Sequence, residues 1–383
     1  MKKLNIGLIG HKFMGKAHTH GYTDVSVFFK PEIEVVKHTI CSNEQSVKDV
    51  AEQWGWKNTT FDWHDVIDNP DIDVVDIAAP SIIHAEISIA AANSGKHVFC
   101  EKPLALTLSD AKAMVDAVQD ADVVNMIGFN YRRVPALALA RRLIDDGEIG
   151  EIFHFRGIYQ QSWLSDKGFP LAWRLRKKDA GYGSHGDLGA HVIDIARYLV
   201  GEFESISCIQ QTFYKQRPIP KIEDGLVAVA GDEMDTVDVD DTSQMLVKFA
   251  GKKTAGYIEV TRYGTGHRNQ NRIEINGSKG AILFDMEKMN ELQFYSTSDK
   301  SHIQGFRTIQ VGEADHPYTA NWWPAGHIIG YGDTFVNQVY DFISAIRDNK
   351  KVKPDFKDGY ICQVILDAAQ NSAETGKWVE IKY

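Results

Sequence analysis

The sequence predicts an α/β protein of two domains, in which a parallel sheet comes first and an α+β domain with a large, mainly antiparallel sheet follows. Three observations predict this class. The chain has 383 residues, a length that suits two domains. Its first third alternates short apolar runs with helical patterns, whereas beyond about residue 150 several strand patterns follow one another without helices. Hydrophobic residues make up 43% and charged residues 25%, as in globular proteins with full cores.

The first domain, residues 1–128, is expected to alternate strands and helices. The strands are residues 4–9, 34–41, 74–78, 97–100 and 123–128. The helices are residues 16–29, 43–54, 85–94 and 108–119. Strands that alternate with helices form βαβ units, and right-handed crossovers bring such strands into one parallel sheet.

The second domain, residues 129–383, is expected to hold the antiparallel sheet. Its strands are residues 152–161, 205–212, 243–249, 255–261, 272–276, 281–285 and 291–295. Turn signals such as Asn276-Gly277 join several of them. Helices are expected at residues 187–199, 333–348 and 358–374, and the C-terminal ones are candidates for packing back on the first domain.

Charge and cysteine content exclude several classes of protein. Acidic residues outnumber basic residues by 52 to 42, and the resulting net charge of −10 repels nucleic acid and anionic lipid. The four cysteines are far apart without a CxxC pair, so we expect reduced thiols. The N-terminal apolar run is too short for a signal peptide, and no stretch approaches the roughly 18 apolar residues that cross a bilayer. We therefore expect a cytoplasmic protein without nucleic-acid or membrane partners.

The loop after the first strand carries most of a dinucleotide fingerprint. The pattern GxGxxG uses its glycines for a tight turn, for close approach of a pyrophosphate and for packing of helix on strand. Gly10 and Gly15 stand at the first and third places, while Lys12 occupies the middle one. Because the loop joins a strand to a helix N-terminus that can hold phosphate, we expect a Rossmann-type cofactor domain. The alternative is a tight turn without a ligand.

The residues after the second strand leave the choice of cofactor open. An acid is expected there to bind the ribose hydroxyls of NAD. Ser42 occupies that place, between Cys41 and Asn43. Lys12 nearby would suit the 2′-phosphate of NADP, but no arginine follows to secure it.

Three residues have the chemistry for oxidation of an alcohol. Lys102 directly follows a strand, at the sheet edge where α/β proteins bind ligands, and precedes Pro103, which favours an extended backbone. Asp187 and His191 are four apart on an expected helix and so share one face. A histidine near neutral pKa or a lysine with a lowered pKa can take the hydroxyl proton. Purely structural roles in the helix are the alternative for Asp187 and His191.

A metal site is a second alternative at this helix. His185, Asp187 and His191 supply three possible ligands within seven residues. Residues two apart on a helix point in different directions, so His185 fits poorly with the other two. We therefore expect no metal.

The order of these motifs resembles the Gfo/Idh/MocA family, whose members are nicotinamide-dependent oxidoreductases of sugars, inositols and related polyols. The resemblance covers nearly the whole chain. It rests on the Gly-rich first loop, Ala79-Pro80 with His84, Glu101-Lys102-Pro103, Asn130-Tyr131-Arg132-Arg133, Gly186-Asp187 with His191, and the run 237–241. Residues 13–18 and 330–332 are similar to a branch that acts on pyranoside hydroxyls.

The resemblance implies roles for individual residues. It makes Lys102, Asp187 and His191 the catalytic set, with His191, or Lys102 through the substrate hydroxyls, as general base. The residues implied for the cofactor are Gly10, Lys12, Phe13, Met14, Ser42, Ala79, His84, Glu101 and Asn130. Candidates for the substrate, with aromatic faces and polar donors, are Tyr131, Trp173, Arg174 and His185.

The expected activity is oxidation of a secondary hydroxyl of a sugar, glycoside or cyclic polyol. The resemblance favours NAD, whereas Lys12 and Ser42 favour NADP. It also implies a homo-oligomer, a dimer or tetramer. Two alternatives stay open: a glycoside hydrolase that uses tightly held NAD for transient oxidation, and a cofactor-binding protein without turnover.

Overall fold

The computed structural model describes residues 2–224 and 227–383 of the chain. By the contacts between their Cα atoms, the residues divide into two units. Unit 1 runs to Asn130 and takes in Gly330–Gln363, while unit 2 comprises Tyr131–Ile329 and Val364–Tyr383. Within the described ranges, no helix is both long and apolar enough to cross a membrane.

Unit 1 is built on a six-stranded parallel sheet, as the alternating pattern predicted. The strand order is β3-β2-β1-β4-β5-β6. The order reverses direction between β1 and β4, and α/β sheets bind their ligands beside such a reversal. The strands are β1 (Lys3–Ile9), β2 (Glu34–Cys41), β3 (Asn58–Thr60), β4 (Val74–Ile77), β5 (His97–Cys100) and β6 (Asn125–Ile127). The three-residue β3 is too short and too polar to have been recognised in the sequence.

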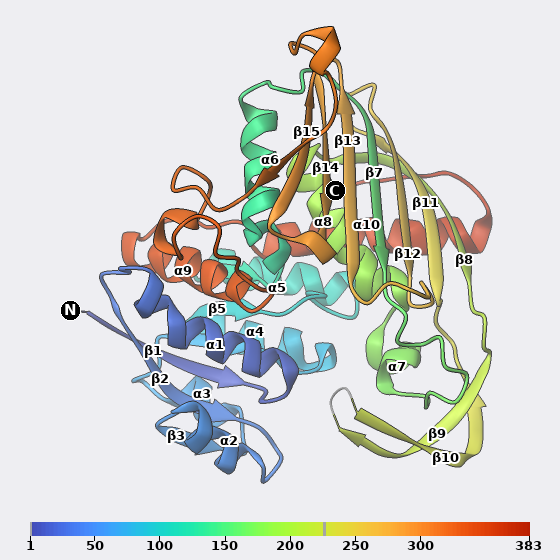
Figure 1. Ribbon diagram of the computed structural model, residues 1–383. Helices are drawn as coiled ribbons and strands as arrows, with labels where there is room; N and C mark the ends of the chain where they lie inside the picture. Colours follow the sequence, from blue (N-terminus) through green and yellow to red (C-terminus); the bar gives the residue numbers. More distant parts are fainter. Residues whose placement is uncertain (1, 225–226) are drawn as a thin grey trace. The chain divides into compact units, whose positions relative to one another are not determined.

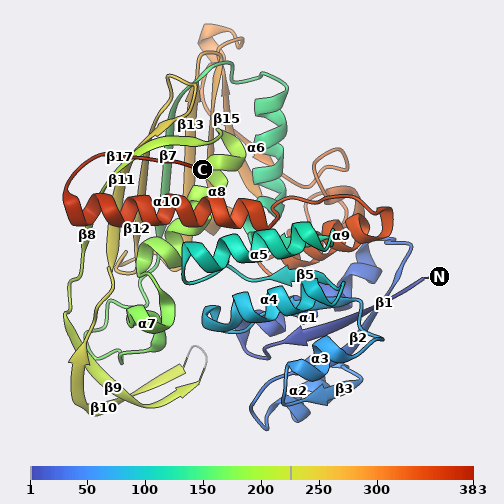
Figure 2. The same ribbon diagram turned by 180° about the vertical axis from the view of Figure 1, so that it is seen from behind.

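Helices cover both faces of this sheet. Helices α1 (Phe13–Phe28) and α9 (Asp333–Asp348) lie side by side on one face, and α4 (His84–Asn93) and α5 (Leu108–Asp120) lie on the other (Figures 1 and 2). The unit also contains α2 (Val47–Trp54) and α3 (His64–Asp68). Phe99 of β5 packs against Phe342 of α9 with ring centroids 5.4 Å apart, so the core joins α9 to the sheet.

Unit 2 contains a nine-stranded sheet that is mainly antiparallel, as predicted. Its order is β16-β15-β14-β13-β7-β12-β11-β8-β17, and the pair β7–β12 is parallel. The strands are β7 (Ile152–Gln160), β8 (Phe203–Gln211), β11 (Thr242–Phe249), β12 (Ala255–Thr261), β13 (Gln270–Gly277), β14 (Gly280–Asp285), β15 (Glu291–Ser296), β16 (Arg307–Gln310) and β17 (Val379–Glu380).

Helices α6 (Pro135–Asp145) and α8 (Ala190–Leu199) pack on one face of this sheet (Figure 2). A side chain at Gly157 of β7 would overlap Val192 of α8, so the glycine permits close packing. A separate hairpin, β9 (Gln216–Asp224) and β10 (Val227–Thr236), and α6 were not foreseen from the sequence. The short α7 (Lys177–Ala180) also belongs to this unit, while α10 (Phe356–Thr375) supplies residues to both units.

Short helical turns connect these elements. They are η1 (Ser81–Ile83), η2 (Asn130–Arg133), η3 (Trp173–Leu175), η4 (His185–Gly189), η5 (Met286–Lys288), η6 (Ser301–Ile303) and η7 (Thr319–Asn321). The turn η4 is π-helical and leads directly into α8, so the helix expected from residue 187 begins with a wider turn.

The contact between α1 and α9 yields a test of the fold. A Cβ at Gly21 would lie 2.8 Å from Val339 Cγ2 and 3.0 Å from the Phe335 carbonyl oxygen. Gly21→Ala is therefore expected to lower the free energy of unfolding by about 1–3 kcal/mol, the usual cost of overpacking. Gly305→Ala is the control, since a Cβ there meets nothing within 4 Å. Urea unfolding measures both, and equal stability of the two variants would contradict this packing.

Candidate functional site

The first loop of unit 1 has the geometry that the glycine pattern predicts. Gly10 has a φ of +108°, and a Cβ there would overlap the Ala78 carbonyl oxygen. A Cβ at Gly15 would overlap the Gly10 carbonyl oxygen. Both positions therefore require glycine, and the chain passes closely from β1 into the N-terminus of the 16-residue α1. The N-terminus of a helix offers unpaired backbone N–H groups that can bind a phosphate.

Lys12 is bound to a carboxylate that the sequence analysis missed. Its Nζ lies 2.5 Å from Glu44 Oε2. Glu44 also accepts a hydrogen bond from Ser46 Oγ at 3.4 Å, and Ser46 Oγ lies 2.9 Å from His11 Nε2. Ser42 shapes this turn by accepting the Glu44 N–H at 3.3 Å. Glu44 thus lies three residues beyond the end of β2, near the place where the sequence analysis expected an acid.

His84 links the predicted cofactor residue Ala79 to the turn that follows Lys102. Its Nε2 lies 2.9 Å from the Ala79 carbonyl oxygen and its Nδ1 3.0 Å from that of Pro103. Burial lowers the pKa of His84, although the two carbonyls favour the protonated ring. His84 therefore holds the backbone of Pro103, the residue after the half-buried Lys102.

Two other predicted cofactor residues contact the segment that begins at Gly330. The ring of Phe13 stacks on Tyr331, with centroids 6.3 Å apart and an interplanar angle of 17°. Asn130 donates a hydrogen bond from Nδ2 to Thr334 Oγ1 at 2.8 Å. Met14, in the first turn of α1, is half-buried. The C-terminal segment of unit 1 thereby fixes residues around the glycine loop.

A buried histidine, His18, lies between two carboxylates, one of which belongs to Glu101, the residue before Lys102. His18 Nδ1 is 2.8 and 2.9 Å from the two carboxylate oxygens of Asp76, and its Nε2 is 3.0 Å from Glu101 Oε1. Glu101 Oε2 accepts the backbone N–H of Lys102 at 3.2 Å. Burial lowers the pKa of His18, but Asp76 and Glu101 outweigh this effect and raise it to about 10. His18 is therefore a cation at neutral pH.

The catalytic candidates of unit 2 begin helix α8. Asp187 lies in the π-helical turn and His191 at the second position of α8. The ring of His191 packs 4.5 Å from that of Tyr131. Tyr131 Oη in turn lies 2.7 Å from Tyr159 Oη, and burial is the main cause that raises the pKa of Tyr131. Single π-helical turns are frequent at functional sites.

The remaining substrate candidates come from the segment before this turn. The Arg174 guanidinium lies 4.3 Å above the Trp173 ring. Burial lowers the pKa of Arg174, while the charge of Asp187 acts in the opposite direction, so the two side chains interact. His185 is buried and contacts Asp240 instead of solvent, and its contact with substrate stays a prediction. Within the described residues, no three histidine, cysteine, aspartate or glutamate side chains are grouped to hold a metal ion.

Comparisons with known proteins agree with both halves of this arrangement. Residues 4–129 match the model of an oxidoreductase family with an NAD-binding Rossmann fold, and residues 137–283 match the GFO/IDH/MocA C-terminal domain. A levoglucosan dehydrogenase of Pseudarthrobacter phenanthrenivorans is 45% identical over 100% of this chain and 99% of that protein. An inositol 2-dehydrogenase of Rhizobium meliloti is 27% identical over 81% of each.

Solved structures of oxidoreductases are also similar to this chain over its full length. Levoglucosan dehydrogenase in complex with NADH and levoglucosan has 43% sequence identity and a TM-score of 0.94, with 100% of both chains covered. An oxidoreductase domain protein from Kribbella flavida has 42% identity and a TM-score of 0.95, again over the full length of both.

The raised pKa of His18 predicts how stability depends on pH. Because the folded-state pKa of about 10 exceeds the unfolded value of 6.5, the stabilisation is complete below pH 6.5 and is lost as pH rises through 10. The unfolding free energy of the wild type should therefore exceed that of His18→Gln by an amount that shrinks by up to about 4 kcal/mol over this range.

Urea unfolding at several pH values from 6 to 10.5 measures this difference. The control is His302→Gln, because His302 is exposed. A difference between wild type and His18→Gln that stays constant with pH would show that His18 is neutral when buried.

Proposed function

Because the chain belongs to the Gfo/Idh/MocA family of oxidoreductases, we propose that it is an NAD-dependent dehydrogenase that oxidises a secondary hydroxyl of a sugar, glycoside or cyclic polyol. The observation that carries this proposal is the similarity, over the whole length of both chains, to a levoglucosan dehydrogenase. An anhydro-pyranose such as levoglucosan is therefore the first substrate to test. Proteins named as inositol dehydrogenases are more distant relatives.

The residues of unit 1 fit a dinucleotide. A side chain at Gly10 would overlap the Ala78 carbonyl oxygen and one at Gly15 would overlap that of Gly10, so the two glycines permit the close turn from β1 into α1. The N-terminus of α1 then offers backbone N–H groups to a pyrophosphate. The residues proposed to hold the cofactor are Gly10, Lys12, Phe13, Met14, Ser42, Ala79, His84, Glu101 and Asn130. When bound, nicotinamide supplies the acceptor for a hydride. Glu44, next to Lys12, accepts ribose hydroxyls, and its charge disfavours an additional phosphate.

Lys102, Asp187 and His191 carry the proton chemistry in this proposal. His191 takes the hydroxyl proton at an imidazole nitrogen while the carbon loses its hydride. Lys102 donates hydrogen bonds to the substrate hydroxyl, and Asp187 orients it. Arg174 and Trp173 are the proposed sugar contacts, since Arg174 interacts with Asp187 and Trp173 offers an aromatic face.

The alternatives from the sequence are not favoured. Three relatives that align with 99% or more of this chain are named as dehydrogenases, which argues against a glycoside hydrolase and against a protein without turnover.

We also propose a cytoplasmic homo-oligomer. Four free, buried cysteines suit a reducing compartment. The face of the large sheet opposite α8 exposes Ile209 and Leu246, at 67% and 53%, and offers an apolar surface for a second copy.

Substitution of the proposed proton-transfer residues should abolish most of the activity. Lys102→Met and His191→Asn are each expected to lower kcat/KM by about 10²–10⁴, the usual contribution of a positioned acid or base. The matched controls are Lys112→Met and His302→Asn, which change exposed residues. NADH formation is followed with levoglucosan, other pyranosides and inositols. Wild-type activity in either test variant would refute its role, and glycoside cleavage without net NADH would favour the hydrolase.

The Lys12–Glu44 ion pair predicts how cofactor preference responds to mutation. Glu44→Gln removes the carboxylate that repels a 2′-phosphate, so the ratio of dissociation constants for NADP and NAD should fall about tenfold. Lys12→Gly leaves the Glu44 charge unneutralised and should move the ratio in the opposite direction. Isothermal titration with each cofactor measures both. A wild-type preference for NADP of tenfold or more, lost in Lys12→Gly, would overturn the assignment of NAD.

A further inference from the structure

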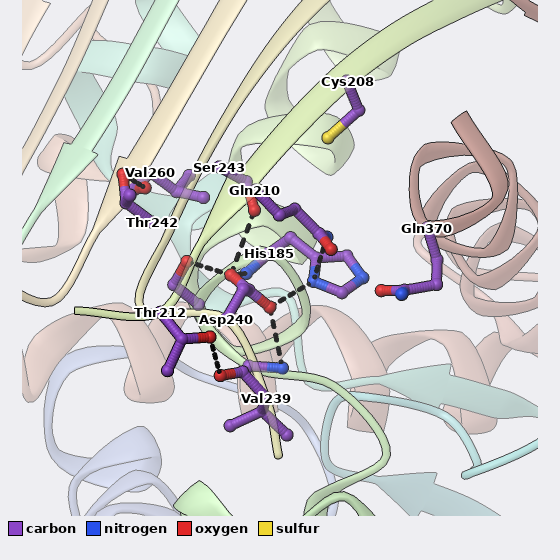
Figure 3. Close-up of polar contacts among 12 residues, drawn as sticks. His185, Cys208, Gln210, Thr212, Val239, Asp240, Thr242, Ser243, Val260 and Gln370 are labelled. Carbon is purple, nitrogen blue, oxygen red and sulfur yellow. Dashed lines mark hydrogen bonds and ion pairs between the residues drawn. The ribbon is translucent and has the colours of Figure 1, made fainter. Parts of the chain in front are cut away.

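The buried carboxylate of Asp240 accepts hydrogen bonds from the first residue of the π-helical turn, His185, and from the two residues before it (Figure 3). Its Oδ1 accepts from the backbone N–H of Gly183 at 3.1 Å and lies 2.7 Å from His185 Nδ1. Its Oδ2 accepts from the backbone N–H of His185 at 3.1 Å and from the hydroxyl of Ser184. Ser243 Oγ, on β11, completes the set at 3.0 Å. Four donors to one carboxylate therefore come from three consecutive residues.

The backbone of Asp240 and the shape of the segment reinforce these contacts. The carbonyl oxygen of Asp240 accepts the N–H of Ser184 at 3.0 Å and the guanidinium of the fully buried Arg262 at 2.8 Å. A Cβ at Gly183 would overlap this carbonyl, so only glycine permits the approach. Burial raises the pKa of Asp240, but the charges of His185 and Arg262 outweigh this and hold the pKa below its ordinary range. Asp240 is therefore ionised at neutral pH. We call its contacts with residues 183–185 the clamp.

Residues 183–185 lie just before the catalytic candidates Asp187 and His191 in the chain. The N–H of Asp187 donates to the carbonyl oxygen of Gly183 at 3.0 Å, so the position of Asp187 follows that of Gly183. The π-helical turn then continues into α8, whose second residue is His191. A shift of the 183–185 backbone would move Asp187 directly and would tilt the first turn of α8.

His185 contributes a fixed ring to the same clamp. Because a carboxylate oxygen only accepts, Nδ1 of His185 carries the proton that Asp240 binds. The ring also packs edge-on against Tyr182, with centroids 4.8 Å apart, and is 1% exposed. Both features limit its rotation. Burial of a polar ring costs free energy unless the ring is hydrogen-bonded, and an apolar side chain would fill the same space without that cost. The hydrogen bond between His185 and Asp240 therefore indicates more than a space-filling role.

We propose that Asp240, together with His185, is a positioning residue for the oxidation: its carboxylate fixes the backbone of Gly183–His185 and thereby sets the orientation of Asp187 and His191. This inference rests on the proposed function. Nothing in it requires Asp240 to touch the substrate, since its side chain is 4% exposed and its oxygens already have protein donors.

The test compares two adjacent buried carboxylates. Asp240→Asn keeps the volume but replaces one acceptor oxygen with a donor. Asp241→Asn is the matched control, because Asp241 is also buried and accepts the backbone N–H of Phe213 at 2.7 Å instead of any donor in residues 183–185. We expect kcat with levoglucosan to fall about 10–100-fold in Asp240→Asn, with an unchanged dissociation constant for NAD, and to stay within about twofold of wild type in Asp241→Asn. Equal losses in both would overturn the proposal.

A second pair of variants separates positioning from substrate contact at His185. Asn places a donor near the position of Nδ1, so His185→Asn should recover kcat relative to His185→Leu, which has no donor. If both variants instead keep kcat and raise the KM for the sugar, His185 is a substrate contact and the proposal fails for it.

Hydrogen–deuterium exchange provides a readout that does not depend on activity. Amide exchange of residues 183–191 should be faster in Asp240→Asn than in wild type and unchanged in Asp241→Asn. This result supports the clamp even if no sugar is oxidised by the wild type, an outcome that would refute the proposed function alone. Unchanged exchange in Asp240→Asn would refute the clamp.

Discussion

The hydrogen bonds between a buried histidine and buried carboxylates hold the chemistry-bearing segments of this protein in place. In unit 1, His18 lies between Asp76 and Glu101, and Glu101 accepts the backbone N–H of Lys102. A buried charge is tolerated only when it is paired, so each member of this group depends on the others. The strand end that carries Lys102 is thus fixed by charge pairing as well as by the sheet.

In unit 2, a buried carboxylate and a buried histidine are again hydrogen-bonded to each other. Asp240 binds His185 and the backbone around it, and the π-helical turn with Asp187 follows directly. π-helical turns are rare and occur mostly as single turns within α-helices, frequently at functional sites. The buried carboxylate binds the first residue of this turn, His185, and the two residues before it. In each unit, therefore, a residue with no proposed role in proton transfer determines where a proposed catalytic residue lies.

The fold and the family were within reach of sequence analysis, whereas the supporting contacts were not. Alternation of strands and helices predicted the parallel sheet, and the order of motifs that includes Lys102 and His191 identified the family, as the comparisons confirm. Residues 13–18 and 330–332 indicated the branch, in agreement with the 45% identity to a levoglucosan dehydrogenase. The sequence analysis did not identify Glu44 as a candidate acid, because it lies three residues beyond the end of β2 instead of directly after it. His18 and Asp76 are 58 residues apart in the sequence, and a pairing over this distance leaves no local pattern that would predict it.

The parallel pairing of β7 with β12 has a consequence for folding. The two strands lie next to each other in the sheet, yet Gln160 ends one and Ala255 begins the other. The chain between them contains α7, the π-helical turn, α8, β8, the hairpin and β11. Closing so long a loop costs entropy before any contact repays it, and a high mean sequence separation of contacts slows folding. Pairing of β7 with β12 therefore carries a large entropic cost, and the helix that carries His191 lies within the chain that this pairing encloses.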